Sequence, residues 1–238
     1  AWRAEGGPEP AAVAGHSLGE YSALVAAGAM TLADALPLVR LRAEAMQRAV
    51  PVGAGAMAAI LGLDADKVGV ICAEVAAATG AVVAPANFND PLQTVIAGAK
   101  AAVDAARDRL KAAGAKRALP LPVSAPFHCA LMAPAAEELR AHLAAVRIGT
   151  PRIPVVNNID VATPGAPDAI RDALYRQAFG PVRWVECVQR LKALGATHIV
   201  ECGPGKVLAG LVRRIDPELV GVPLYDPESL KQAQELLA

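Results

Sequence analysis

The sequence predicts a layered α/β protein that carries a small inserted α+β subdomain. Short apolar runs that suit buried strands alternate with helical stretches along most of the chain. Residues 54–123 interrupt this alternation with the order β-α-β-β-α-β, which is typical of a ferredoxin-like module. The length of 238 residues suits one large domain or one domain with an insert, and 54% hydrophobic against 19% charged residues excludes disorder.

The first elements frame a tight turn. Residues 10–15 form a short apolar run that ends in glycine and predicts a buried strand. A helix is expected from Leu18 to about Ala27, and Gly28 suits its C-terminal end. A near capping box opens a second helix over residues 31–50, in which Pro37 should either kink the helix or shift its start.

The inserted subdomain and the elements after it follow from periodicity and turn residues. In order, the subdomain elements are a strand at 54–63, a helix at 64–78, strands at 81–88 and 92–97, a helix at 99–113 and a strand at 117–123. Strands are then expected at 155–156 and 198–201, and helices at 167–178 and 184–194. The chain thus divides into a discontinuous core, residues 1–53 and 124–238, and a subdomain, residues 54–123.

Composition excludes several functional classes. Lys and Arg number 23, as do Asp and Glu, so the net charge of zero argues against nucleic acid as a partner. The longest stretch without a charged residue, 118–136, contains four prolines and cannot form a regular membrane span. No signal-peptide pattern opens the chain, and the four cysteines form neither a CxxC pair nor a zinc-like pattern. We therefore expect reduced thiols, no bound metal and a cytoplasmic location.

Residues 15–19, Gly-His-Ser-Leu-Gly, match the pattern G-x-S-x-G directly between a predicted strand and a predicted helix. In that context Ser17 would lie on a strained strand-to-helix turn as a nucleophile, with glycines that permit close packing around it. The Leu18 N–H would then point at a developing oxyanion. The simpler alternative is a serine turn that only caps a helix.

A serine nucleophile needs a base, and His128 is the best placed histidine because it lies in a proline-rich segment at the expected seam between subdomain and core. Spacing alone leaves a purely structural role for it equally open. The remaining histidines are expected to be structural or solvated: His16, His142 and His198. Arg40 and Arg42 both flank the apolar face of helix 31–50, and either suits a substrate carboxylate. Periodicity does not choose between them.

Residues 15–24, Gly-His-Ser-Leu-Gly-Glu-Tyr-Ser-Ala-Leu, resemble the signature of the malonyl-CoA:acyl carrier protein transacylases. Four further stretches agree in order along the chain: residues 46–47, 87–89, 122–128 and 201–208. The resemblance implies an α/β-hydrolase-like core with a parallel sheet plus an inserted ferredoxin-like (βαββαβ) subdomain.

The resemblance also implies a role for each site residue. Ser17 would accept the acyl group, His128 would be its base, and the backbone carbonyl of Gln177 would hold His128 in place of a carboxylate. Arg42, rather than Arg40, would bind the free malonyl carboxylate. The implied pocket-lining positions are Phe127, which suits malonyl selectivity, Met46 and Asn87. Two basic pairs, 116–117 and 213–214, either meet an acidic carrier protein or are ordinary solvated charges.

The implied activity moves a malonyl group from malonyl-CoA to the phosphopantetheine thiol of acyl carrier protein through a malonyl-serine ester, for fatty acid biosynthesis. No cofactor, metal, membrane or nucleic acid is expected, and the chain is expected to be a monomer. Three alternatives remain: a polyketide-synthase-type acyltransferase domain, a serine hydrolase or esterase, and a carrier-binding module without catalysis.

One departure from the family pattern affects the expected activity. Family members carry a Gly-Gln-Gly-Ser-Gln loop ahead of the serine turn, which supplies a second oxyanion donor, and this sequence has no such loop. The resemblance is therefore to an N-terminally truncated member, in which Leu18 would be the one donor and activity would be reduced.

Overall fold

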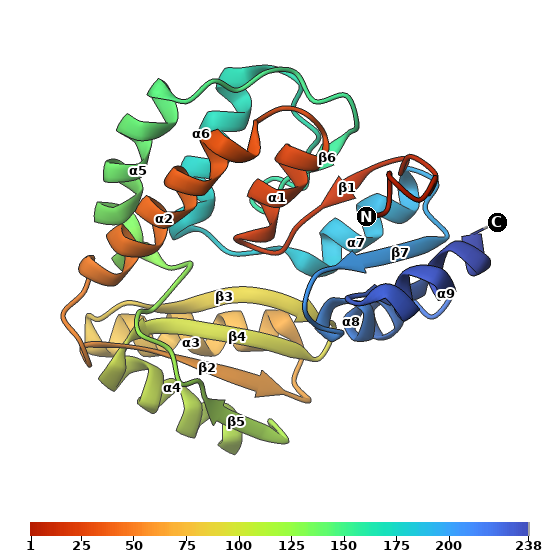
Figure 1. The fold of residues 1–238 in the computed structure, drawn as a ribbon. Helices are drawn as coiled ribbons and strands as arrows, with labels where there is room; N and C mark the ends of the chain where they lie inside the picture. Colours follow the sequence, from red (N-terminus) through yellow and green to blue (C-terminus); the bar gives the residue numbers. More distant parts are fainter. Residues whose placement is uncertain (238) are drawn as a thin grey trace.

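The computed structural model describes residues 1–237, and the chain forms a helix-rich part packed against a separate four-stranded sheet with its own helices (Figure 1). The elements in chain order are β1 (Val13–Ala14), α1 (Gly19–Ala26), α2 (Leu32–Arg48), β2 (Gly55–Leu61), α3 (Ala65–Thr79), β3 (Val83–Asp90), β4 (Gln93–Ala99), α4 (Lys100–Ala112), β5 (Arg117–Pro120), a 3-10 turn (Ala130–Met132), α5 (Ala133–Ala145), β6 (Val155–Val156), α6 (Pro167–Phe179), α7 (Trp184–Ala193), β7 (His198–Cys202), α8 (Val207–Ile215), β8 (Val220–Leu224) and α9 (Pro227–Leu237).

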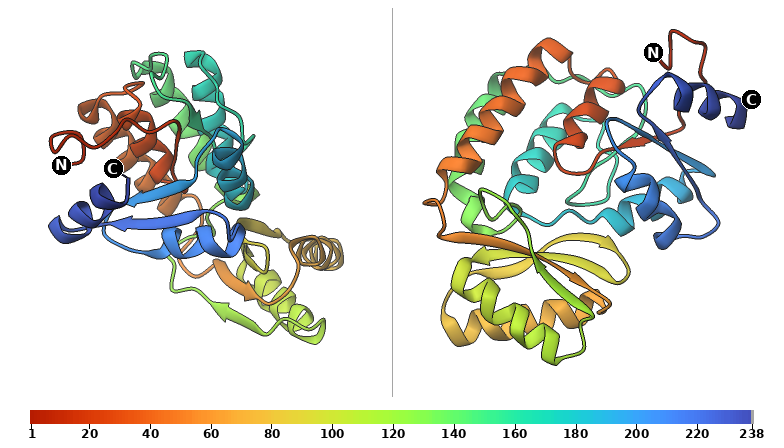
Figure 2. Two further views of the ribbon diagram at one scale, coloured as in Figure 1. Left: turned by 90° about the vertical axis from the view of Figure 1, so that its right-hand side faces the viewer. Right: turned by 60° about the horizontal axis from the view of Figure 1, so that its bottom comes forward.

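The four-stranded sheet has the strand order β3-β4-β2-β5, and every neighbouring pair is antiparallel. Its strands and helices follow the order predicted for residues 54–123. Alternation along β2 separates two apolar layers: Ala58 and Ile60 pack with α3 and α4, whereas Met57 and Ala59 pack toward the segment that carries Cys129. The sheet therefore lies between its two helices and the rest of the chain, as the two views of Figure 2 show.

The remaining strands form two parallel pairs, β1 with β6 and β7 with β8. The run 10–15 was expected to be one strand, but only Val13 and Ala14 pair, in register with Val155 and Val156. Pro10 has no N–H to donate, and Asn157 begins a turn that ends β6 after two residues. The predicted parallel sheet is thus present as separate two-stranded pairs in residues 1–237.

Helix α2 begins where the capping box predicts. Thr31 is its N-cap, and its hydroxyl oxygen accepts a hydrogen bond from the Asp34 N–H at 3.1 Å. Pro37 lies inside the helix and does not shift its start. Strand β3 was expected to end at residue 88, before a turn at 89–91, but it continues to Asp90, whose side chain accepts from the Leu92 N–H at 2.9 Å and so shapes the turn itself.

Within residues 1–237, no helix combines the length and the apolar character needed to cross a bilayer. All four cysteines are free thiols, three of them buried. Across the same residues, no three His, Cys, Asp or Glu side chains come together as a potential metal site.

Candidate active site

The serine turn joins the end of β1 to the start of α1. Ser17 has a φ of +53°, a left-handed conformation that is rare for a residue with a side chain. A Cβ on Gly15 would lie 1.9 Å from the backbone of Gly19, so the two ends of the turn touch and only glycine fits at position 15. A Cβ on Gly19 would meet nothing within 4 Å. The expectation that the glycines permit close packing is therefore confirmed at Gly15 and wrong at Gly19.

Ser17 and His128 lie within hydrogen-bonding distance, with Oγ 2.7 Å from Nε2. On the other side of the ring, Nδ1 is 3.0 Å from the Gln177 carbonyl and 3.2 Å from the Gly180 carbonyl. Both carbonyls can only accept, so Nδ1 carries the proton and Nε2 is free to accept one from the serine. His128 is thus oriented as a base by backbone carbonyls, with no carboxylate behind it.

The electrostatic surroundings keep His128 neutral. Burial, and after it the positive charge of Arg42, lower the pKa of the imidazole to about 3. A histidine with that pKa is unprotonated at neutral pH and can accept the serine proton. The positive charge of Arg42 disfavours the protonated form of His128. An anion bound to Arg42 would reduce this effect, so the protonation of His128 is coupled to anion binding at Arg42.

Arg42 projects from α2 into the site and is only 7% exposed. Its Nη2 donates to Ser17 Oγ at 2.9 Å and to Gln177 Oε1 at 3.2 Å. Its Nε–H is buried with no hydrogen-bond partner among residues 1–237. Arg40 instead lies at the surface and pairs with Glu44 at 2.9 Å. The geometry therefore selects Arg42 from the two arginines that periodicity left open.

Gln177 contributes both its backbone and its side chain. It lies on α6 with no exposed surface, and its carbonyl oxygen accepts from His128 as the resemblance implied. Its side-chain Nε2 also donates to the Ser17 carbonyl at 3.0 Å and to Glu20 Oε2 at 2.9 Å. These side-chain contacts were not anticipated, and they bind the nucleophile turn to α6.

The other predicted positions are less directly placed. The Leu18 N–H meets no acceptor within residues 1–237, so it is available to a ligand oxygen. Met46 lies one helical turn after Arg42 and is buried, and Phe127, next to His128, packs between two apolar clusters. Asn87 lies on β3 beside Val182, and in the described chain no hydrogen bond joins its side chain to Ser17 or His128.

The remaining three histidines lie away from Ser17 Oγ. His16 turns away from Ser17 to contact Asn89 at 2.9 Å, and burial lowers its pKa. His142 is exposed on α5, and His198 begins β7. Of the two basic pairs considered for a carrier protein, the second is partly neutralised because Arg214 donates to Asp90 at 2.8 Å.

Two buried polar residues escaped the sequence analysis, Glu20 and Asn158. Asn158 lies two residues after the end of β6, and its side-chain oxygen accepts from the Ser17 N–H at 2.7 Å. The sequence held one signal for it: two asparagines follow the buried valines at 155–156, at the carboxyl end of a parallel strand, where sites in α/β folds commonly form. Glu20 directly follows the serine motif at residues 15–19, but nothing in its spacing indicated that its side chain is buried.

Together these groups provide a hydroxyl nucleophile, a neutral base and a buried cation around one point. This arrangement suits acyl transfer through a serine ester with an acyl group that carries a negative charge. A serine hydrolase would place an acidic residue behind the histidine, and here two backbone carbonyls take that position.

Comparison with known proteins identifies the family. The acyl transferase domain family matches residues 1–217. The malonyl CoA-acyl carrier protein transacylase of Escherichia coli is 55% identical over 235 residues, covering 99% of this chain and 75% of that protein. The crystal structure of an acyl-carrier-protein S-malonyltransferase from Burkholderia pseudomallei is 62% identical, with a TM-score of 0.96, covering 98% of this chain and 76% of that one. A malonyl-transacylase solved in complex with a type II PKS acyl-carrier protein is 51% identical, with a TM-score of 0.96. The match covers 99% of this chain and 75% of that one. The chain therefore belongs to the malonyl-CoA:acyl carrier protein transacylase family of acyl transferase domains.

Proposed function

We propose that this chain is an acyl-carrier-protein S-malonyltransferase, which moves a malonyl group from coenzyme A to the phosphopantetheine thiol of acyl carrier protein. One observation carries the proposal: the buried guanidinium of Arg42 lies 2.9 Å from Ser17 Oγ, which itself lies 2.7 Å from His128 Nε2. A buried cation beside the nucleophile favours an acyl group that brings its own carboxylate.

In the first half-reaction, Ser17 Oγ loses its proton to His128 Nε2 and attacks the thioester carbonyl carbon of malonyl-CoA. The Leu18 N–H faces the oxyanion that forms, and Arg42 pairs with the free carboxylate. When the carbon–sulfur bond breaks, coenzyme A leaves as the thiol with the proton from His128, and a malonyl ester remains on Ser17. The rising positive charge on the imidazole is tolerated because the malonyl carboxylate offsets the charge of Arg42.

In the second half-reaction, the carrier-protein thiol gives its proton to His128 Nε2 and its sulfur attacks the serine ester. The ester bond breaks, Ser17 Oγ recovers the proton from the histidine, and malonyl-carrier protein leaves. Every step is assigned to side chains and backbone groups of this chain, so the proposal includes no metal and no cofactor besides the two thiol-bearing substrates.

The direct test is intact-mass measurement after mixing with malonyl-CoA. The unaltered chain should gain the mass of one malonyl group, and Ser17→Ala should gain none because the attacking oxygen is gone. An adduct of the same size on Ser17→Ala would overturn the assignment of the nucleophile. Hydrolysis of simple esters without transfer to a carrier thiol would favour the esterase alternative instead.

A second candidate differs only in the acceptor. The relative solved with a type II PKS acyl-carrier protein is 51% identical to this chain, so a polyketide carrier is an alternative to a fatty acid carrier. Offering the malonylated chain to a holo carrier of each kind, and comparing the second-order transfer rates, distinguishes the two. Binding of either carrier without any covalent adduct would favour the non-catalytic module.

The finer description of the fold belongs to the same proposal. We propose that residues 54–123 are a ferredoxin-like subdomain inserted into an α/β-hydrolase-like core formed by residues 1–53 and 124–238. The strand order β3-β4-β2-β5, with both helices on one face, supports the first part. Role and location are proposed with it: a cytoplasmic monomer that supplies malonyl groups for fatty acid biosynthesis.

A further inference from the structure

The backbone of Ser17 is held from both sides by two buried side-chain amides. Asn158 accepts the Ser17 N–H at its Oδ1, at 2.7 Å, and donates from Nδ2 to the Gly15 carbonyl at 2.8 Å. Gln177 donates from Nε2 to the Ser17 carbonyl at 3.0 Å. Side chains from two other parts of the chain thus bind the peptide groups on each side of a residue in the left-handed conformation.

Asn158 is itself fixed at every polar group. Its N–H donates to Glu20 Oε2 at 2.9 Å, and its carbonyl accepts from the Arg183 N–H at 3.1 Å. With the two side-chain bonds to the serine turn, each of its four polar groups (backbone N–H, backbone C=O, Oδ1 and Nδ2) has a partner, and none of its surface is exposed. A fully bonded, buried amide has one orientation, so it can act as a rigid support.

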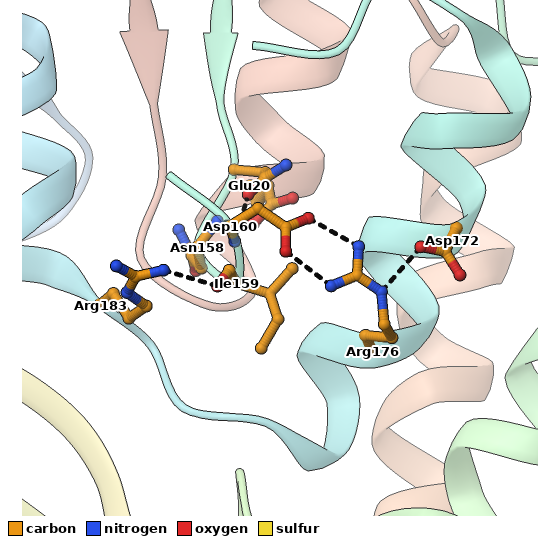
Figure 3. A network of polar contacts seen from close by, with 8 residues as sticks. Glu20, Asn158, Ile159, Asp160, Asp172, Arg176 and Arg183 are labelled. Atoms are coloured by element: carbon orange, nitrogen blue, oxygen red, sulfur yellow. Dashed lines mark hydrogen bonds and ion pairs between the residues drawn. The ribbon is translucent and has the colours of Figure 1, made fainter. Parts of the chain in front are cut away.

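The two residues that follow Asn158 are held by arginine side chains nearer the surface (Figure 3). Arg183 donates to the Ile159 carbonyl at 3.3 Å, and the guanidinium of Arg176 donates to both carboxylate oxygens of Asp160, at 2.7 and 2.6 Å. Arg176 directly precedes Gln177 on α6. The loop after β6 and the helix that orients His128 are therefore joined at the surface as well as in the interior.

Glu20 contacts the Asn158 backbone and the Gln177 side chain at once. Its Oε2 accepts from the Asn158 N–H and from Gln177 Nε2, each at 2.9 Å. Because this oxygen accepts, the NH2 group of Gln177 must face it, and the Gln177 oxygen must then face Arg42. One carboxylate therefore sets the orientation of the Gln177 side chain and anchors the backbone of Asn158, and both residues touch the nucleophile turn.

We propose that Asn158, anchored by Glu20, is a positioning residue that keeps Ser17 in its left-handed turn, with Oγ within reach of His128. A left-handed backbone at a residue with a side chain persists only where its surroundings enforce it, and these hydrogen bonds do so. The proposal rests on the proposed function for the identity of the acyl donor alone, since the support of the serine turn is testable without any acyl-CoA.

The test compares Asn158→Ala with Asn157→Ala. Asn157 is the matched control because it is the neighbouring buried asparagine, yet its side-chain oxygen accepts from Asp160 N–H within its own loop, at 2.8 Å. The first readout is the rate at which a fluorophosphonate probe labels Ser17. Asn158→Ala should slow labelling roughly 10- to 100-fold because Oγ is no longer held in line with the base, and Asn157→Ala should stay within about threefold of the unaltered chain.

Steady-state kinetics with malonyl-CoA provide the second readout. Asn158 acts through the nucleophile and not on the acyl group, so kcat should fall in Asn158→Ala while KM for malonyl-CoA changes less than about threefold. Labelling of Asn158→Ala at the unaltered rate, or an equal loss in Asn157→Ala, would overturn the proposal. Normal probe labelling without any malonyl adduct on the unaltered chain would instead count against the proposed function and leave this inference standing.

Hydrogen exchange at the Ser17 amide decides the question whatever the activity of the chain. This amide should be protected in the unaltered chain and in Asn157→Ala, and it should exchange at least about tenfold faster in Asn158→Ala. Glu20→Gln keeps an acceptor oxygen for both amides and should retain protection, whereas Glu20→Ala should lose it. Equal exchange in all five proteins would contradict the proposed support.

Discussion

In the proposed function, Arg42 is the residue that gives the site its preference for an acyl group with a carboxylate. A guanidinium that is 7% exposed, with one N–H unpartnered among residues 1–237, has lost most of its hydration without gaining a full set of acceptors. Glu20 interacts with its charge from a distance and does not occupy its donors. The buried guanidinium therefore favours a bound anion, and in the proposed function the terminal carboxylate of the acyl group supplies it.

Arg42→Ala should slow acylation by malonyl-CoA roughly 30-fold or more, because a hydrogen-bonded charge pair is lost from a buried place. This factor corresponds to an increase of about 2 kcal/mol in the activation free energy. Acylation by acetyl-CoA should not fall, since acetyl has no carboxylate to pair. The measurement is the ratio of the two kcat/KM values. Arg40→Ala is the control, because its guanidinium is at the surface of the same helix, and it should keep the ratio. A preserved malonyl preference in Arg42→Ala would show that another group reads the carboxylate.

At this scale the sequence predicted side chains only where a local pattern marked them. Ser17 and Leu18 followed from the motif, but Arg40 and Arg42 both flank one apolar stripe, and only tertiary packing buries the second. Asn158 lies 141 residues from Ser17, so its contact depends on how β6 is placed beside β1. No local pattern encodes such a pairing, and the resemblance to a family supplied Gln177 for its backbone and not for its side chain.

At the scale of elements, the strand–turn–helix unit at residues 13–26 shows what the two glycines of the motif each require. The backbone on the two sides of the turn meets at Gly15, where any Cβ would collide, whereas Gly19 opens α1 with free space beside it. The motif therefore contains one glycine required by packing and one that packing in this chain does not require.

Gly15→Ala and Gly19→Ala should consequently have opposite effects on stability. Gly15→Ala forces apart the ends of the turn and should lower the free energy of unfolding by about 2 kcal/mol or more. Gly19→Ala reduces the entropy of the unfolded chain at a helical position. It should therefore raise the free energy of unfolding by about 0.5–1 kcal/mol. Urea denaturation followed by circular dichroism measures both. Equal destabilisation by the two substitutions would show that Gly19 is also confined.

Elements with strong local signals were predicted more accurately than those that depend on distant partners. In residues 54–123, caps and turn residues mark several boundaries, as with Asp64, whose side chain accepts from the N–H groups of Asp66 and Lys67. The two-residue strands β1 and β6 depend on pairing with each other, so the predicted length at 10–15 was too great. The C-terminal elements α8, β8 and α9 were not predicted, although β8 pairs with β7 along its whole length.

At the scale of the whole molecule, the site network contains two buried groups with opposite proton linkage. Burial raises the pKa of Glu20 to about 7, from 4.5, against the opposing hydrogen bonds from Gln177 and Asn158. Burial and Arg42 lower the pKa of His128 to about 3, from 6.5. Folding therefore takes up a proton at Glu20 and releases one at His128 between about pH 4.5 and 6.5, and the two effects offset each other.

Glu20→Gln should remove one side of this balance and make stability depend on pH. In the unaltered chain the raised pKa of Glu20 contributes stability that is fully present below pH 4.5 and is lost as pH rises through about 7. The lowered pKa of His128 contributes stability that is present above pH 6.5 and is lost as pH falls toward 3. Relative to the unaltered chain, Glu20→Gln should gain stability with rising pH between 4.5 and 7, with a slope that approaches about 1.4 kcal/mol per pH unit. His128→Gln should show the opposite slope between pH 3 and 6.5.

Surface carboxylates such as Asp104 and Asp216 are common to all three proteins and cancel in the differences. Urea denaturation at half-unit pH steps measures the curves. A Glu20→Gln curve that is parallel to that of the unaltered chain would mean that Glu20 titrates alike in the folded and unfolded chain, and that its buried carboxylate is fully compensated by Asn158 and Gln177.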